Sequence, residues 1–152
     1  MTDSKVIRAR AADGAGIATV YLSSTAKLGF LPRRHSGQDT WNHFATMPTK
    51  QACWVVRDSG RITAFLATQT GWIDHLYVHP SAQSRGHGTT LLEQAKRALP
   101  QGFELWTFQQ NTRARAFYDT KGLFITERTD GRRNEEHLPD LKYVWRPEGK
   151  IT

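Results

Sequence analysis

The chain of 152 residues contains one cysteine and no apolar run close to the length of a membrane span. Cys53 has no second cysteine to pair with, so an internal disulfide and a multi-thiolate metal site are both excluded. A membrane helix needs about 20 consecutive, largely apolar residues, so no membrane partner is expected. Charged residues follow Met1 closely, without a secretory signal, and with the lone thiol this favours a cytoplasmic protein.

The sequence also lacks internal repeats, low-complexity tracts and linkers rich in proline and glycine. A hydrophobic fraction of 38%, with aromatic residues at 11%, suffices for a buried core. We therefore expect a single domain over residues 1–152.

The net charge of +7 favours an anionic partner. Lys and Arg are dispersed along the chain, and Glu135, Glu136 and Asp140 interrupt the most basic stretch. Because no basic stripe or nucleic-acid-binding motif is present, nucleic acid is not expected as a partner. An anionic small molecule such as a nucleotide cofactor suits the charge, although charge alone does not identify it.

Hydrophobic spacing and turn residues predict the elements of the first half. A strand over 6–10 precedes a helix over 14–28 that Asp13 caps, and a second helix covers 38–47. Strands follow at 53–57, 62–69 and 72–78. In the last of these strands one face carries Trp72, Asp74, Leu76 and Val78, and the other carries Ile73, His75 and Tyr77. Both faces bear apolar groups, which is typical of a central strand.

The second half alternates helices and strands. A helix is predicted over 88–98, a strand over 103–108, and a helix over 111–121 that stops at Gly122. Strands over 123–128 and 142–146 complete the chain. The order predicts an α/β domain with a mixed sheet.

A glycine-bearing loop, Gln83-Ser84-Arg85-Gly86-His87-Gly88, separates the strand over 72–78 from the next helix. In this position several backbone N–H groups and the helix N-terminus point to one place, which favours phosphate oxygens. Arg85 and His87 would add positive charge or hydrogen-bond donors. A structural turn also uses two glycines, so the loop alone indicates only an anion site. Leu91 stands where a dinucleotide fingerprint needs a third glycine.

Two motifs in the right order make the signal specific. Gln83-x-x-Gly86-x-Gly88 follows Leu76-Tyr77-Val78-x-Pro80, and Asn111 to Tyr118 then precedes Gly122-Leu123-Phe124. This combination resembles the GNAT superfamily of N-acetyltransferases, and the ending around Glu135, Glu136 and Asp140 resembles that of bacterial members. The resemblance implies the GNAT fold, a mixed central sheet of about six or seven strands flanked by about four helices.

The same resemblance implies acetyl-CoA as co-substrate and direct transfer of the acetyl group to a primary amine of a small molecule or peptide. The backbone of the loop would bind the pyrophosphate; its residues are Gln83, Ser84, Arg85, Gly86, His87, Gly88 and Thr89. Leu76, Tyr77 and Val78 would hold the pantetheine arm, with the Leu76 N–H facing the thioester oxygen. Asn111 matches an asparagine that contacts the arm, and it also suits a helix N-cap.

Tyr118 matches the tyrosine that protonates the coenzyme A thiolate in many relatives. A phenol with a pKa near ~10 suits that transfer; the alternative is a core aromatic, as expected for Phe117. Asp74 is a candidate base acting through water, or a structural acceptor for a loop amide. His75 and His79 would lie about 13 Å apart along a strand, so no metal is expected.

The acceptor side is less defined. Glu135 and Glu136 are candidates to hold a substrate ammonium, although ion pairs with Arg132 and Arg133 are an equal alternative. His35 is a candidate on the opposite wall. A transferase using another acyl-CoA and a non-catalytic acyl-CoA sensor remain alternatives, and a homodimer is common among such proteins.

Overall fold

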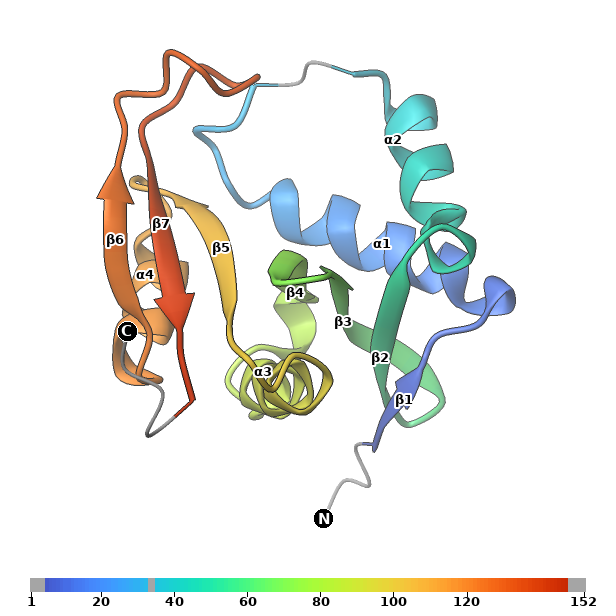
Figure 1. The fold of residues 1–152 in the computed structure, drawn as a ribbon. Coiled ribbons are helices and arrows are strands. Elements are labelled where there is room, and N and C mark those ends of the chain that lie inside the picture. Colours follow the sequence, from blue (N-terminus) through green and yellow to red (C-terminus); the bar gives the residue numbers. More distant parts are fainter. Residues whose placement is uncertain (1–4, 33–34, 148–152) are drawn as a thin grey trace.

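The computed structural model describes residues 5–32 and 35–147. It contains a seven-stranded sheet in the order β1-β2-β3-β4-β5-β7-β6 (Figure 1). The strands are β1 (Lys5–Arg8), β2 (Ala52–Asp58), β3 (Arg61–Gln69), β4 (Trp72–Val78), β5 (Phe103–Phe108), β6 (Phe124–Arg128) and β7 (Asp140–Trp145). The α-helices are α1 (Gly14–Thr25), α2 (Gly37–Ala45), α3 (His87–Ala98) and α4 (Thr112–Thr120). Three short 3₁₀ turns, η1 (Ala11–Asp13), η2 (Met47–Thr49) and η3 (Pro80–Ala82), complete the described elements.

The sheet consists of two antiparallel parts that meet at a short parallel junction. Strands β1 to β4 pair as antiparallel neighbours, and β7 lies antiparallel between β5 and β6. Between β4 and β5 the parallel register comprises one pair, Trp72 with Glu104. Beyond this pair the two strands separate, and the opening positions the site described below.

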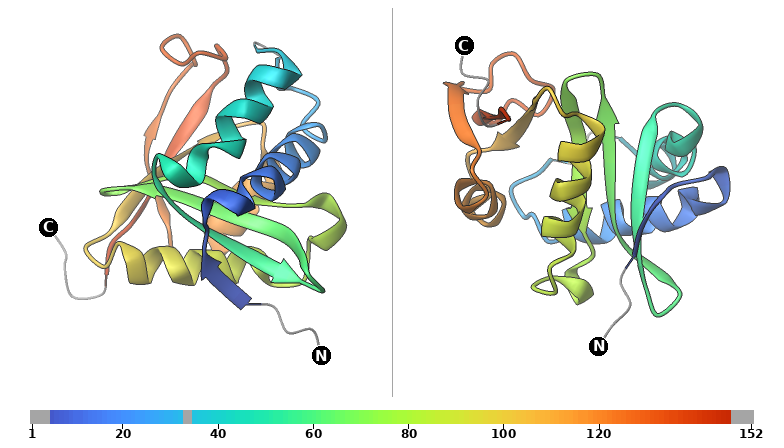
Figure 2. Two further views of the ribbon diagram at one scale, coloured as in Figure 1. Left: turned by 90° about the vertical axis from the view of Figure 1, so that its right-hand side faces the viewer. Right: turned by 60° about the horizontal axis from the view of Figure 1, so that its bottom comes forward.

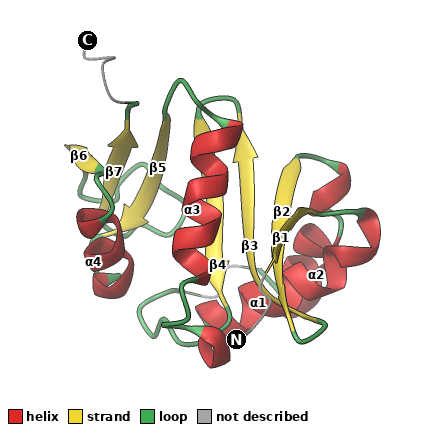
Figure 3. Cartoon of the chain, turned by 90° about the horizontal axis from the view of Figure 1, so that it is seen from below, coloured by secondary structure: helices red, strands yellow, loops and turns green. Residues whose placement is uncertain are grey.

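Helices cover both faces of the sheet. Helices α1 and α2 pack on one face and α3 with α4 on the other (Figures 2 and 3). Helix α3 buries Leu91, Leu92 and Ala95 at helical spacing, together with Phe103 of β5. Burying each large apolar side chain contributes about 1.5–3 kcal/mol, so this face anchors the helix against the sheet.

The predicted fold class is confirmed by seven strands and four α-helices among the described residues. The strands over 72–78 and 103–108 have the predicted bounds, and most other boundaries differ by one or two residues. The first helix ends at Thr25 instead of residue 28, and the chain continues from there as turns and a loop.

The prediction that the Asp13 side chain caps the first helix is wrong. Its side chain makes no capping bond to α1. Its carboxylate instead accepts a hydrogen bond from the Arg10 N–H, at 2.9 Å, and forms an ion pair with Arg57 of β2. Asp13 is buried, so a charged partner is required there. It therefore joins the start of α1 to the sheet.

The two predicted faces of β4 are wrong at the start of the strand, before the bulge. The register with β3 slips between His75 and Ile73, so Asp74 is the extra residue of a β-bulge. Ile73 consequently belongs to the core under α3, where Leu76 also packs. His75 and Tyr77 face α1. Strict alternation predicted Ile73 on the His75 side, and the bulge reverses it.

Candidate functional site

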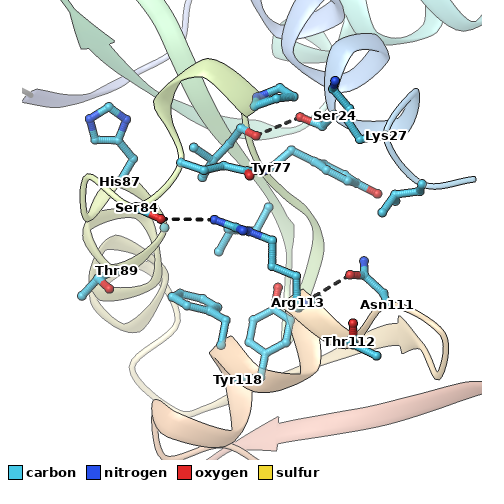
Figure 4. A pocket seen from close by; sticks show the side chains of 18 of the residues that line it. Ser24, Lys27, Tyr77, Ser84, His87, Thr89, Asn111, Thr112, Arg113 and Tyr118 are labelled. Atoms are coloured by element: carbon cyan, nitrogen blue, oxygen red, sulfur yellow. Dashed lines mark hydrogen bonds between the residues drawn. The ribbon is translucent and has the colours of Figure 1, made fainter.

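A cavity of ≈ 1010 Å³ opens where β4 and β5 separate (Figure 4). Its walls come from the end of β4, the loop into α3, the first turns of α4 and the segment after α1. Ser24 of α1 closes one side, because its hydroxyl donates to the Val78 carbonyl at 3.0 Å. Segments far apart in the sequence thus form one concave surface.

The backbone of β4 faces this cavity. The His79 N–H donates to the Thr63 carbonyl at 2.7 Å, which makes this a hydrogen-bonded pair of the antiparallel β3–β4 ladder. Such pairs alternate with pairs that do not bond each other. Leu76 and Val78 therefore direct their N–H and C=O groups away from β3, toward the opening. This orientation leaves the Leu76 N–H available to a ligand.

The loop before α3 adopts the backbone that a close ligand approach requires. Gly86 lies in the left-handed region at φ 85°, where a side chain is strained, and no atom lies within 4 Å of the position of a Cβ. Helix α3 begins at His87, so its unpaired N–H groups point toward the same space. Gly88 is needed for another reason, because a Cβ there would lie 3.3 Å from the Phe117 ring.

Ten of the eleven residues predicted to bind the cofactor line the cavity, and Tyr118 lines it too. The ten are Leu76, Tyr77, Val78, Gln83, Ser84, Gly86, His87, Gly88, Thr89 and Asn111. Asn111 also caps α4, since its side-chain oxygen accepts from the Ala114 N–H at 3.2 Å. Its two expected positions, in the helix cap and beside the cavity, therefore coincide.

The sequence predicts that the Arg85 and His87 side chains add charge or donors beside the ligand. In the structure both side chains contact residues that do not line the cavity. The Arg85 guanidinium donates to Asp58 at 3.2 Å, and Arg85 does not line the cavity. The His87 ring is buried, with Nδ1 3.0 Å from the Thr63 hydroxyl. Burial lowers the pKa of His87, while Asp58 opposes the shift. Both side chains turn toward the β2–β3 turn.

Three cations that the sequence motifs did not single out line the cavity instead: Lys27, Arg113 and Lys121. Arg113 reaches across from α4, with its guanidinium 3.4 Å from the Ser84 hydroxyl (Figure 4). Among the described residues no Asp or Glu lines this cavity. Its charge therefore suits an anionic ligand.

Tyr118 is buried on α4, and its hydroxyl points into the cavity (Figure 4). Burial raises the pKa of the phenol, and the neighbouring Tyr143 ring, 5.5 Å away between centroids, raises it further. The phenol therefore keeps its proton at neutral pH. Among the described residues, no hydrogen bond engages this hydroxyl, which leaves it able to donate to a ligand.

Asp74 lies outside the cavity. Its carboxylate accepts hydrogen bonds from the side-chain amides of Gln51, at 2.8 Å, and Gln69, at 2.6 Å. These contacts agree with the alternative in which Asp74 is a structural hydrogen-bond acceptor and not a base. The bulge that displaces Ile73 also directs Asp74 away from the opening.

A second cavity of ≈ 540 Å³ lies beside the first. The β6–β7 connection contributes Glu136, Arg133 and Asn134, and β5 contributes Trp106 and Phe108. The Phe108 ring lies 6.0 Å from that of Phe30, which lines the first cavity. The two cavities therefore adjoin across this aromatic pair. Asn134 bridges its own loop, donating to the Leu138 carbonyl at 2.6 Å.

The predicted acceptor residues on the two walls meet in space. His35 Nε2 lies 2.7 Å from Oε1 of Glu135. Burial raises the pKa of Tyr21 on α1, and the charges of Glu136 and Glu135 raise it further. Burial also raises the pKa of Tyr77, with a contribution from Glu136. Both glutamates thus act on Tyr21, and Glu136 also acts on Tyr77, which lines the first cavity.

No group of three or more His, Cys, Asp or Glu side chains in the described part of the chain is arranged to hold a metal ion. Within 5–32 and 35–147, no helix is long and apolar enough to cross a membrane.

The described sheet opens over a glycine loop and a helix N-terminus, with a buried tyrosine across the cavity, an arrangement that suits an acyltransferase. The model of the acetyltransferase (GNAT) family matches residues 17–123 of this chain. The chain belongs to the GNAT family and is an N-acetyltransferase.

Solved structures agree on the fold. The solution structure of apo YjaB from Escherichia coli has a TM-score of 0.77 at 20% identity, covering 93% of this chain and 97% of that one. A GNAT-family acetyltransferase from Bacillus cereus has a TM-score of 0.75 at 17% identity, covering 95% and 97%. An N-acetyltransferase from Staphylococcus aureus has a TM-score of 0.70 at 15% identity, covering 95% and 98%. No curated protein sequence matches this chain.

Proposed function

We propose that this enzyme transfers the acetyl group of acetyl-CoA directly to a primary amine of a small molecule or peptide. The observation that carries the proposal is the cavity between β4 and β5. It combines the loop backbone at Gly86, outward-facing peptide groups of Leu76 and a buried phenol at Tyr118. These are the parts that thioester binding and acyl transfer require.

The donor would bind along the length of this cavity. The pyrophosphate would take the N–H groups of Gly86 to Thr89 at the start of α3. Lys27, Arg113 and Lys121 would neutralise the remaining phosphate charge. The pantetheine arm would run past Leu76 and Val78, whose peptide groups point into the opening, with Asn111 on the opposite wall.

The transfer needs charge stabilisation at one atom and a proton at another. As the amine nitrogen bonds to the carbonyl carbon, the thioester oxygen becomes negative, and the Leu76 N–H would donate to it. When the carbon–sulfur bond breaks, the thiolate would take the proton of Tyr118. The proton that the amine nitrogen loses as the amide forms would pass to solvent water, and Tyr118 would regain its proton from water. Burial raises the pKa of Tyr118, and the same desolvation would make a thiolate beside it more basic, so the phenol can still act as its proton donor.

The acceptor would enter through the second cavity. Glu136 lines this cavity and supplies a carboxylate for the substrate ammonium, while Trp106 and Phe108 provide an apolar floor. The Phe30–Phe108 pair marks the passage to the thioester. Glu135 and His35 would order the rim by their mutual contact.

The test is thiol release from acetyl-CoA in the presence of a panel of primary amines. The panel should include polyamines, amino acids, arylalkylamines and peptide N-termini, with a no-amine control. Amine-dependent release, with a matching acetylated product by mass spectrometry, supports the proposal. Binding of acetyl-CoA without release across the panel would instead indicate a sensor, and faster release from propionyl- or succinyl-CoA would indicate another donor.

A further inference from the structure

Asp58 lies at the end of β2, outside the cavity, and its side chain is only 4% exposed. A buried carboxylate needs compensating donors. One charged donor comes from the glycine loop, because Arg85 donates to Oδ2 at 3.2 Å. His87 Nε2 lies 3.8 Å from the same oxygen, beyond hydrogen-bond distance, and the Ser59 hydroxyl donates to Oδ1 at 3.4 Å. One buried acid thus contacts the residues on both sides of Gly86.

The second contact of His87 strengthens this arrangement. Its Nδ1 lies 3.0 Å from the hydroxyl of Thr63 on β3. The imidazole therefore lies between β3 and the Asp58 turn, where it is 3% exposed. The first residue of α3 is consequently held to the sheet through its side chain.

We propose that Asp58 is a positioning residue for the donor site, acting through Arg85 and His87. Because both side chains turn toward Asp58, the backbone between them turns toward the cavity, and Gly86 takes the left-handed conformation that this path requires. The charge-assisted hydrogen bond from Arg85 to the buried carboxylate, together with the packing of His87 against it, favours one loop conformation. The inference rests on the proposed donor function of the loop.

Two variants test this role. Asp58→Asn keeps the shape of the side chain and removes its charge; Arg85→Gln removes the main donor from an exposed position, with little risk to folding. Each variant should weaken acetyl-CoA binding roughly tenfold, the scale expected for losing a hydrogen bond to a charged group. The value of kcat at saturating acetyl-CoA should stay within about twofold, because neither residue touches the reacting atoms.

The double variant separates positioning from direct contact with phosphate. If Asp58 acts through Arg85, the variant that carries both substitutions should bind acetyl-CoA about as weakly as Asp58→Asn alone. If Arg85 instead binds phosphate directly, Asp58→Asn would release it and leave binding unchanged or tighter, which overturns the proposal. The proposal would also be overturned if the fold-losses in acetyl-CoA affinity of the two single variants multiplied in the double variant.

Amide hydrogen exchange of residues 85–88 in the free protein gives a measure that needs no ligand. Exchange should be faster in both variants and unchanged in Glu93→Gln, which removes an exposed acid of α3 paired with Lys96. Unchanged exchange in Asp58→Asn and Arg85→Gln refutes the positioning role. Failure of the wild type to bind acetyl-CoA refutes only the proposed function, so the two ideas fail separately.

Discussion

The imidazole Nε2 of His35 lies 2.7 Å from Oε1 of Glu135, although 100 positions separate the two residues. The contact joins the segment between α1 and α2 to the β6–β7 connection, beside the cavity that Glu136 lines. The side chains are 63% and 54% exposed, so the pair adds little to stability. Its consequence is the arrangement of two loops beside the second cavity.

Glu136→Gln should raise the KM for the amine roughly tenfold or more, because the charged group of the substrate loses its carboxylate partner in the cavity. The KM for acetyl-CoA should stay within about twofold. Glu135→Gln is the matched control, since it removes the same charge one residue away but breaks the surface pair with His35. Steady-state kinetics measures both, and equal effects of the two substitutions would contradict the assignment of Glu136.

Tyr118→Phe should lower kcat by about 10²-fold or more, the scale of general acid catalysis, and leave the Kd for acetyl-CoA nearly unchanged. Tyr143→Phe is the control, because this neighbouring phenol donates to Asp119 at 2.8 Å on the other side of α4. It should cost about 1 kcal/mol of stability with little change in kcat. Wild-type turnover in Tyr118→Phe would remove the general-acid role.

Local signals predicted much of the fold and most of the residues that line the first cavity. Gly71 and Pro80 bound the β4 strand in the sequence, and the glycine loop follows directly. The place of this loop, between a strand and a helix, could be predicted because it depends on local sequence and on the resemblance. The order of helices and strands along the chain agreed because each element carries its own hydrophobic period.

Other features depend on partners that only the folded chain brings together. Arg85 was expected beside the ligand, but Asp58 lies 27 positions earlier and binds its guanidinium. The bulge at Asp74 depends on the register with β3, which no short pattern encodes. Lys27 and Lys121 belong to no motif and meet at the cavity only through tertiary packing.

Gly86→Ala should weaken acetyl-CoA binding at least tenfold, since its φ of 85° strains an added methyl group and the ligand must approach the same point. Gly71→Ala is the control with matched backbone, at φ 78° with open space around the Cβ position, in the β3–β4 turn outside the cavity. Both substitutions should cost about 1 kcal/mol of stability. Calorimetry with acetyl-CoA distinguishes them, and equal affinities would refute the assignment of the loop.

His75 should make the protein less stable as the pH falls. Burial beside Tyr21, Phe44 and Phe65 lowers its pKa to about 4, against about 6.5 in the unfolded chain. Between these values the unfolded state binds the proton and the folded state does not. The free energy of unfolding should therefore fall by up to about 3 kcal/mol from pH 7 to pH 4 through this group.

His75→Phe isolates that contribution, because it keeps an aromatic ring in the cluster and removes the titrating group. Urea unfolding at pH 7, 5.5 and 4.5 should show the wild type losing stability faster than the variant over this window. Burial also lowers the pKa of His87, which gives a loss of the same sign, but His87 is present in both proteins and cancels in the difference. Parallel pH dependences would show that His75 takes up a proton in the folded protein as readily as in the unfolded chain.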